Sequence, residues 1–508
     1  MSCSKSSRIS KFESLFVEDQ EKSLLEPADW GSFREEAHRA LDIALDFARD
    51  RAKAPVWAPL PEYARNIEEG LPRSGAPLTT VVDEIQQRVL PHTLGNTHPR
   101  FWGWVNGSGT PSGIVSQLLN GAINANVGGR DHSPIYIERQ LIRWMCELFD
   151  YPLDAGGIVC TGTSTATLYG LAVARHRTLG DDVRQLGNQD TRLVAYCSAQ
   201  AHVSVSKAIE LMGLGSDALR AIPVQDDFAI NAHALAEQIV ADRAAGLQPF
   251  AVISSVGSVN TGAIDDLQAI NAICAEHHCW HHVDGAFGAL IALSDTMRPR
   301  LAGIEQADSI AFDFHKWMHV PYSSACLLVR DREEHLATFA TAHAYLKGEN
   351  RGVAGGAPWP NDFGIDLSRG FSALGPWMLL KEMGSQRLGA AIERNCRQAA
   401  WLGEQVDAHP ALERLAPVSL NIVCFRFVTG SIGADQLNRL NRHLVVELQC
   451  RGIAVPSFTR LNGNTAIRVC IANHRTTRAD LAALIEAVPL LGEELLRAGG
   501  EPAAFELQ

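Results

Sequence analysis

Between residues 157 and 330 the sequence alternates short apolar runs with longer stretches that carry apolar residues at helical spacing. Each of the first three runs is followed by a helical pattern or a long crossover, which is typical of a largely parallel sheet with helices on both faces. The runs are GIVCT (157–161), RLVAYCS (192–198), FAVISSVG (250–257), WHHVDG (280–285), SIAFD (309–313) and SACLLVR (324–330). The pattern predicts an α/β domain with a mostly parallel mixed sheet.

A second set of strand and helix patterns follows a long amphipathic region near 371–407. It comprises NIVCFRFV (421–428), a helix near 433–451, AIRVCIAN (466–473) and a last helix near 478–497. Helical patterns also precede the first strand, at 31–52 and 79–90. We therefore expect an N-terminal helical segment (1–95), a large domain (96–370) and a small α+β domain (371–508).

Composition limits the partners of the chain. The 57 acidic residues outnumber the 45 basic ones, giving a net charge of -12, which argues against binding to nucleic acid or to an anionic membrane. There is no apolar run of about eighteen residues, as a membrane-spanning helix requires, and the start lacks the apolar region of a secretory signal. Many of the eleven cysteines lie inside apolar runs, as free thiols in a reducing compartment do. We expect a cytoplasmic protein.

In such sheets ligands bind beyond the carboxyl ends of the strands, so residues just after each strand are the candidates. The first run continues as TGTSTATLYGLAVAR, a small-residue turn that opens a helix. Thr163 and Ser164 would place backbone N–H groups and hydroxyls at the helix N-terminus, where a phosphate binds readily. A plain helix-capping turn is the alternative that the turn alone leaves open.

Two further strand ends carry candidates. Asp284 ends WHHVD and could hold a protonated ring nitrogen, while Ala286 would let a flat ring lie close to the backbone. His202 lies between a strand and an amphipathic helix, where an imidazole could stack on a planar cofactor. Each has a structural alternative, a turn aspartate and a structural histidine. Histidine pairs spaced by four residues at 277–282 straddle a helix-to-strand change, so we expect no metal site there.

The stretch SIAFDFHKWMHVPY (309–322) places Lys316 among large apolar residues. Burying an ammonium there is costly, so we expect a lowered pKa and a nucleophilic amine. A lysine that extends to solvent is the alternative. The four candidates together point to pyridoxal 5'-phosphate (PLP) as the cofactor. They are a turn that could bind the phosphate, an acid for the pyridinium nitrogen, an imidazole that could stack on the ring, and a buried lysine for the aldehyde.

At this point the sequence resembles the group II PLP-dependent amino acid decarboxylases, which include the aromatic-L-amino-acid, histidine and glutamate decarboxylases. The resemblance covers roughly residues 75–500. DFHKWMHVPY resembles the family's Asn/Asp-x-His-Lys-Trp motif, and HVDGAFG its His-Val-Asp-Ala-Ala motif, with Asp284 thirty-two residues before Lys316. The segments YCSAQAHVSVSKA, THPRFWGWV, SPIYIERQLIRWMCELF and IRVCIANHRTT also match family segments.

The resemblance implies PLP fold type I and a role for each candidate. Lys316 would carry the cofactor as an imine, Asp284 would bind the pyridine nitrogen, and His202 would stack on the ring. Thr163, Ser164 and His315 would lie near the phosphate, Asp313 near the phosphate and ring, and Ser258 at a family threonine position. Tyr345, twenty-nine residues past Lys316, matches the mobile-loop tyrosine that protonates the quinonoid formed after the external aldimine loses CO₂. Family members are homodimers with the active site at the interface, so we expect a homodimer here.

The resemblance leaves the substrate open. Trp102 and Trp104, near the expected mouth of the site, favour an aromatic L-amino acid, although such aromatics could equally form interface core. Arg130 and His132 would instead suit an acidic side chain. An oxidative aldehyde synthase on the same scaffold is a further alternative, but relatives of that kind typically have phenylalanine where this chain has Tyr345.

Overall fold

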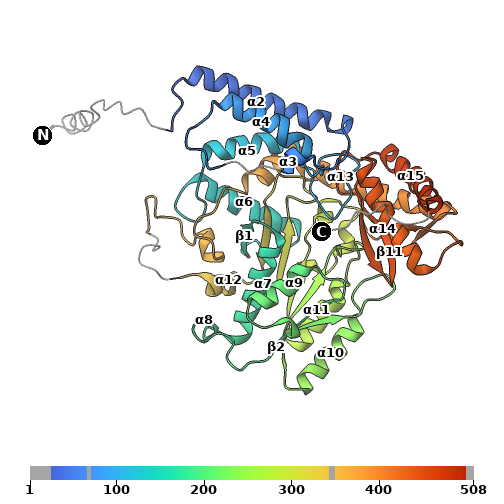
Figure 1. The fold of residues 1–508 in the computed structure, drawn as a ribbon. Coiled ribbons are helices and arrows are strands. Elements are labelled where there is room, and N and C mark those ends of the chain that lie inside the picture. The colour runs from blue at the N-terminus through green and yellow to red at the C-terminus, as the bar shows by residue number, and fades with distance from the viewer. Residues whose placement is uncertain (1–24, 66–69, 342–348, 499–508) are drawn as a thin grey trace.

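The computed structural model describes residues 25–65, 70–341 and 349–498 (Figure 1). Its large sheet has seven strands in the order β1-β7-β6-β5-β4-β2-β3. Strands β6, β5, β4, β2 and β3 run parallel, and β7 lies antiparallel between β1 and β6. This confirms the predicted mixed sheet. The strands are β1 Gly156–Cys160, β2 Leu193–Ser198, β3 Leu219–Ile222, β4 Gln248–Ser255, β5 Trp280–Asp284, β6 Ser309–Asp313 and β7 Ala325–Val329.

Strand β3 is the one member of the sheet that the sequence pattern did not predict. It is an edge strand of four residues, LRAI, and only its last side chain is buried. An edge strand needs no continuous apolar run, because one of its sides faces solvent.

Helices cover both faces of the large sheet. Along β6, Ile310 and Phe312 pack into the same core cluster as residues of α6, whereas Ala311 between them packs on the side of α7. This alternation is the two-residue period of a strand that is buried on both faces. The helices before and around this sheet are α5 Pro111–Ile123, α6 Ser133–Leu148, α7 Thr163–Leu179, α8 Val183–Leu186, α9 Val203–Leu211, α10 Ala232–Ala244, α11 Leu267–His277 and α12 Arg332–Phe339.

The C-terminal part, orange to red in Figure 1, forms a four-stranded antiparallel sheet in the order β10-β11-β9-β8. The long helix α13 leads into it and bends at Gly384, whose φ of 72° suits glycine. The elements are α13 Leu374–Ala408, β8 Leu412–Arg414, β9 Ile422–Phe427, α14 Ala434–Cys450, β10 Ser457–Leu461, β11 Asn464–Cys470 and α15 Arg478–Arg497.

A short segment from the N-terminal half joins the core of this small sheet. Phe101 forms a bridge with Val455, and the Trp102 backbone bonds both Val455 and Cys470. The Trp102 side chain is 1% exposed within the core of the small sheet. The segment expected at the start of the large domain therefore packs with the C-terminal part, and the division of the chain at residues 95 and 370 stays a proposal.

The N-terminal helices α2 (Trp30–Asp50), α3 (Glu62–Arg65) and α4 (Leu78–Glu84) lie outside both sheets, and α2 contacts α4 and α5 (Figure 1). Within the part of the chain that the structure describes, no helix combines the length and the apolar character needed to cross a membrane.

Candidate active site

Residues that follow strands β1, β2, β5 and β6 surround one cavity of about 250 Å³. Because β7 reverses the chain between β1 and β6, those two strands point the same way, and their carboxyl ends reach the same edge of the sheet. The lining consists of Thr161, Gly162, Thr163, Ser164, His202, Ser204, Asp284, Ala286, Asp313, His315, Lys316, Tyr322 and Ser323. Eight of the residues singled out from the sequence therefore meet here, at the edge where ligands of such sheets bind.

Lys316 and His315 line this cavity, whereas the large apolar residues on either side of them do not. Phe314 and Trp317 are buried in the core behind it, and the Lys316 ammonium lies 2.9 Å from Asp313 Oδ2 with 21% of the side chain exposed. Burial lowers the pKa of Lys316, but the carboxylate of Asp313, together with that of Asp284, outweighs this effect, so the pKa is raised. The expectation of a lowered pKa is therefore wrong, because the apolar neighbours form the core and an acid faces the amine.

Asp284 is the last residue of β5 and is 7% exposed. Its Oδ1 accepts a hydrogen bond of 3.2 Å from the Ala286 N–H. Burial raises the pKa of this carboxyl, and the nearby Lys316 ammonium opposes that effect. Within the described chain, Asp284 is thus a buried acid whose second oxygen is available to a ligand in the cavity.

His202 caps α9 at the wall of the cavity. Its Nδ1 accepts from the Ser204 N–H at 3.2 Å and lies 2.7 Å from the Ser204 hydroxyl. The residue is exposed and lines the cavity. Partial burial lowers the pKa of His202, and the carboxylate of Asp284 opposes this. The cap fixes the orientation of a neutral imidazole whose face is free to contact a planar group.

The N-terminus of α7 forms another wall. The Thr163 N–H donates to Asp313 Oδ1 at 2.7 Å, and the Thr163 hydroxyl is buried without a hydrogen-bond partner among the described residues. Such an unpaired buried hydroxyl, beside the positive end of a helix, suits an anionic group. Ser164 lines the cavity next to it and is exposed.

His315 and Tyr322 close the remaining side. His315 Nδ1 lies 2.9 Å from the Ser324 carbonyl oxygen and 3.2 Å from the Ser324 N–H, and its ring lies 4.3 Å from that of Tyr322. The Tyr322 hydroxyl donates to Asn106 Oδ1 at 3.3 Å and accepts from the Gly107 N–H at 3.2 Å. Burial lowers the pKa of His315. Tyr322 was not predicted from the sequence, although it stands only six residues after Lys316 in the same motif.

Ser258 does not line the cavity. It is 4% exposed, accepts from the Ala263 N–H at 3.2 Å and bonds the Thr261 hydroxyl at 3.0 Å. The residue shapes the turn after β4, and its assignment to cofactor binding stays a prediction.

The four residues expected at the substrate mouth are also absent from the cavity lining. Trp102 is a core residue of the small sheet, with its indole N–H bonded to Thr476 at 3.2 Å, and its assignment to the substrate mouth stays a prediction. Trp104 is 54% exposed. Arg130 lies over the ring of Trp359 at 4.9 Å, and His132 Nε2 bonds the Asn126 carbonyl at 3.1 Å. Tyr345 lies outside the described residues.

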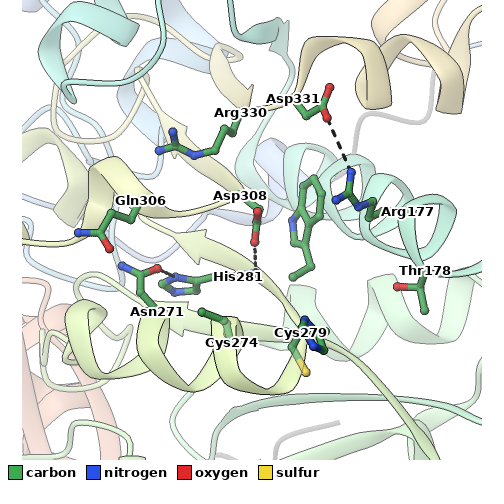
Figure 2. A pocket seen from close by; sticks show the side chains of 13 residues that line it. Arg177, Thr178, Asn271, Cys274, Cys279, His281, Gln306, Asp308, Arg330 and Asp331 are labelled. Carbon is green, nitrogen blue, oxygen red and sulfur yellow. Dashed lines mark hydrogen bonds and ion pairs between the residues drawn. The ribbon is translucent and has the colours of Figure 1, made fainter.

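A larger cavity, about 600 Å³, opens at the opposite edge of the sheet (Figure 2). It lies at the start of β5 and β6, where Asp308 accepts from the His281 N–H at 2.7 Å and His281 Nδ1 bonds Asn271 at 2.6 Å. Arg177 pairs with Asp331 at 3.8 Å across its rim. None of the residues assigned to the cofactor or the substrate from the sequence lines this cavity, so size alone does not identify the active site.

The cavity at the carboxyl edge fits PLP on the observations above. It offers an amine for the aldehyde, a buried acid for the ring nitrogen, an exposed imidazole face, and an unpaired hydroxyl at a helix N-terminus for the phosphate.

Comparisons with known proteins agree. A family model described as the pyridoxal-dependent decarboxylase conserved domain matches residues 61–428. The chain is 31% identical over 473 residues to an aromatic-L-amino-acid decarboxylase of Bacillus atrophaeus, covering 91% of this chain and 96% of that protein. It is 26% identical over 468 residues to a phenylacetaldehyde synthase of Arabidopsis thaliana, covering 90% and 94%.

Among solved structures, that of Oryza sativa TDC with PLP and tryptamine superposes with a TM-score of 0.86 at 24% identity. The superposition covers 92% of this chain and 99% of the Oryza sativa protein's chain, and it confirms the expected fold type. The fold, the cavity and these similarities lead to one conclusion: the chain belongs to the pyridoxal-phosphate-dependent amino acid decarboxylase family, and PLP is its cofactor.

Proposed function

We propose that this protein converts an aromatic L-amino acid to the corresponding amine and CO₂. One observation carries the proposal: Lys316 Nζ, the buried Asp284 carboxyl and the exposed face of His202 open onto the same cavity. Three elements that are distant in the sequence bring together an amine, an acid and a flat neutral ring. That combination serves a pyridoxal cofactor better than any other ligand suggested by the lining.

Bound PLP supplies the electron sink that accepts the electrons left when a carboxylate departs as CO₂. Asp284 would hold a proton on the ring nitrogen, and its buried position strengthens that interaction because few water molecules compete for the carboxylate. His202, with its Nδ1 held by the Ser204 N–H, would stack on the pyridine ring of the cofactor. Thr163, Ser164 and His315 would bind the phosphate. Lys316 would anchor the aldehyde and return to it after each turnover.

Tyr345 is our proposed proton donor to the carbon that loses CO₂. The proposal rests on its position twenty-nine residues after Lys316. A phenolic O–H can deliver this proton, whereas phenylalanine cannot. Replacement of Tyr345 by Phe should lower the amine yield and raise the yields of aldehyde, ammonia and peroxide. Unchanged amine output would refute the role.

An aromatic substrate is favoured by the similarity to the aromatic-L-amino-acid decarboxylase and by the exposed indole of Trp104. The acidic alternative has less support, since Arg130 lies over Trp359 and His132 bonds a backbone carbonyl.

The decisive experiment incubates the PLP-loaded protein with individual L-amino acids and measures CO₂, amine and peroxide. The panel should include phenylalanine, tyrosine, tryptophan, histidine, glutamate, aspartate and cysteine sulfinate, with Lys316→Ala as the inactive control. We expect amine and CO₂ in equal amounts from an aromatic member. Turnover of acidic members alone would contradict the preference, and aldehyde with peroxide would indicate the oxidative reaction instead.

We further propose a cytoplasmic homodimer with the active site at the subunit interface. Exposed apolar side chains on and near α4 and α5 support a partner there: Val81 on α4, Ile85 just after it, and Leu118 and Ile123 on α5. Mixing Lys316→Ala and Tyr345→Phe subunits tests the arrangement. A mixed dimer regains one intact site only if each site combines Lys316 from one subunit with Tyr345 from the other, so no recovery would contradict it.

A further inference from the structure

The carboxylate of Asp313 lies between the N-terminus of α7 and the Lys316 amine and contacts both. Asp313 is the last residue of β6 and is 2% exposed. Its Oδ1 accepts from the Thr163 N–H at 2.7 Å, and its Oδ2 lies 2.9 Å from Lys316 Nζ. The strand fixes its backbone, and the positive end of α7 favours its charge. A carboxylate held in this way is a rigid partner for the amine.

No other carboxylate bonds Lys316 among the described residues. Asp284, at the end of β5, acts on it through space and also favours the ammonium form. The remaining titratable groups that face Lys316 from the elements packed around it are His202 before α9, His315 and Tyr322 on its own loop, and Cys470 on β11. Burial alone would favour the neutral amine, so Asp313 is the main group that keeps it charged.

Formation of the imine requires the opposite state of the amine. An ammonium has no lone pair, so one proton must leave Lys316 before its nitrogen can attack the aldehyde carbon of PLP. Asp313, at 2.9 Å, is placed to take that proton and to return it to the aldehyde oxygen. The nitrogen forms the new C–N bond, the aldehyde oxygen leaves as water with two protons, and the third proton stays on the imine nitrogen.

We propose that Asp313 is a positioning residue that holds Lys316 as an ammonium against the start of α7 until the aldehyde arrives, and thereby sets the pH at which the cofactor is attached. This inference rests on the pyridoxal cofactor and not on the proposed substrate. It gives Asp313 a role toward the lysine rather than the expected role beside the phosphate.

The test is the pH dependence of cofactor attachment. Cofactor-free full-length protein is mixed with PLP between pH 6.5 and 11, and the rate of imine formation is followed by absorbance. In Asp313→Asn the amide can still accept the Thr163 N–H, so the end of α7 keeps its partner. The midpoint of the rate profile should move down by about 1–3 pH units, the usual effect of an opposite charge at this distance. The ionisations of PLP itself are common to all variants.

Asp308→Asn is the matched control. Asp308 directly precedes β6 at the opposite edge of the sheet and accepts the His281 N–H at 2.7 Å (Figure 2). The same substitution there should leave the profile unchanged. An identical profile for Asp313→Asn and the unmodified protein would overturn the proposal, as would an equal shift in Asp308→Asn.

A second measurement does not depend on either variant. An amine-selective reagent applied across the same pH range, with the Lys316 peptide quantified by mass spectrometry, reports the protonation of this lysine in the unmodified protein. Labelling with a midpoint above that of an ordinary lysine supports the proposal, and a midpoint below it overturns the proposal. Attachment of PLP without decarboxylation of any amino acid would contradict the proposed function and leave this inference intact.

Discussion

Gly107 should be intolerant of even one added methyl group. The glycine is buried, and a Cβ atom built on it would stand 1.7 Å from the His315 carbonyl oxygen and 3.1 Å from that of Lys316. Contacts under 3.0 Å are essentially never found for Cβ atoms, so Gly107→Ala must move one of the two segments by about 1.3 Å. The segment that carries Lys316 is one of the two.

A shift of that size at a catalytic group costs on the order of 100-fold in rate. Overpacking of a filled site also destabilises by about 1–3 kcal/mol. We therefore expect Gly107→Ala to lower kcat about 100-fold for the best amino acid substrate. The assay measures amine release at saturating PLP, together with the urea concentration at the midpoint of unfolding.

Gly121→Ala is the control, because Gly121 lies in α5 with no atom within 4 Å of its added Cβ. It should keep full activity and gain a little stability from the higher helix propensity of alanine. Wild-type kcat in Gly107→Ala would refute the reasoning, since it would mean that the contact between the two segments does not position Lys316.

Two further predictions concern buried groups away from the cavity, and a third concerns an exposed indole. Arg369→Met should destabilise by about 3–5 kcal/mol, because it leaves the Glu138 carboxylate buried and unpaired; the pair is 2.8 Å apart with side chains 7% and 1% exposed. Adding Glu138→Gln should restore part of that stability in urea unfolding, and a double variant less stable than the single one would contradict this. Trp102→Ala should destabilise by about 3–5 kcal/mol. Trp104→Ala, at an exposed position, should change stability by less than about 1 kcal/mol and raise KM if the indole contacts the substrate.

Much of the site could be predicted because a parallel sheet brings its strand ends to one edge. The position of Asp284 after WHHV and of Lys316 after SIAFD indicated neighbouring strand ends, and the structure places both at one cavity. The period of each strand and the rule for where ligands bind are enough to predict this.

The rest depended on contacts that local patterns do not encode. The pairing of Lys316 with Asp313 follows from the turn after β6, which brings residues three apart face to face. Trp102 reaches the small sheet because Phe101 pairs with Val455, more than 350 residues away. Tyr322 enters the cavity because β7 runs antiparallel, so the chain before it returns to the edge where β6 ends.

That antiparallel strand also has a consequence for how the site assembles during folding. β6 and β7 pair from Ser309 with Val329 to Asp313 with Ala325, so the loop between them, with Lys316 and Tyr322, is a hairpin closed by near neighbours in the sequence. Pairings between near neighbours in the sequence form early in folding. The hydrogen bond from the Thr163 N–H to Asp313 joins residues 150 apart, so forming it costs more loop-closure entropy. We expect the lysine loop to take shape first and the helix end that faces it to arrive later. A refolding full-length chain would then form the loop with the amine before the anion-binding wall exists, so binding of the cofactor belongs to the last stage of folding.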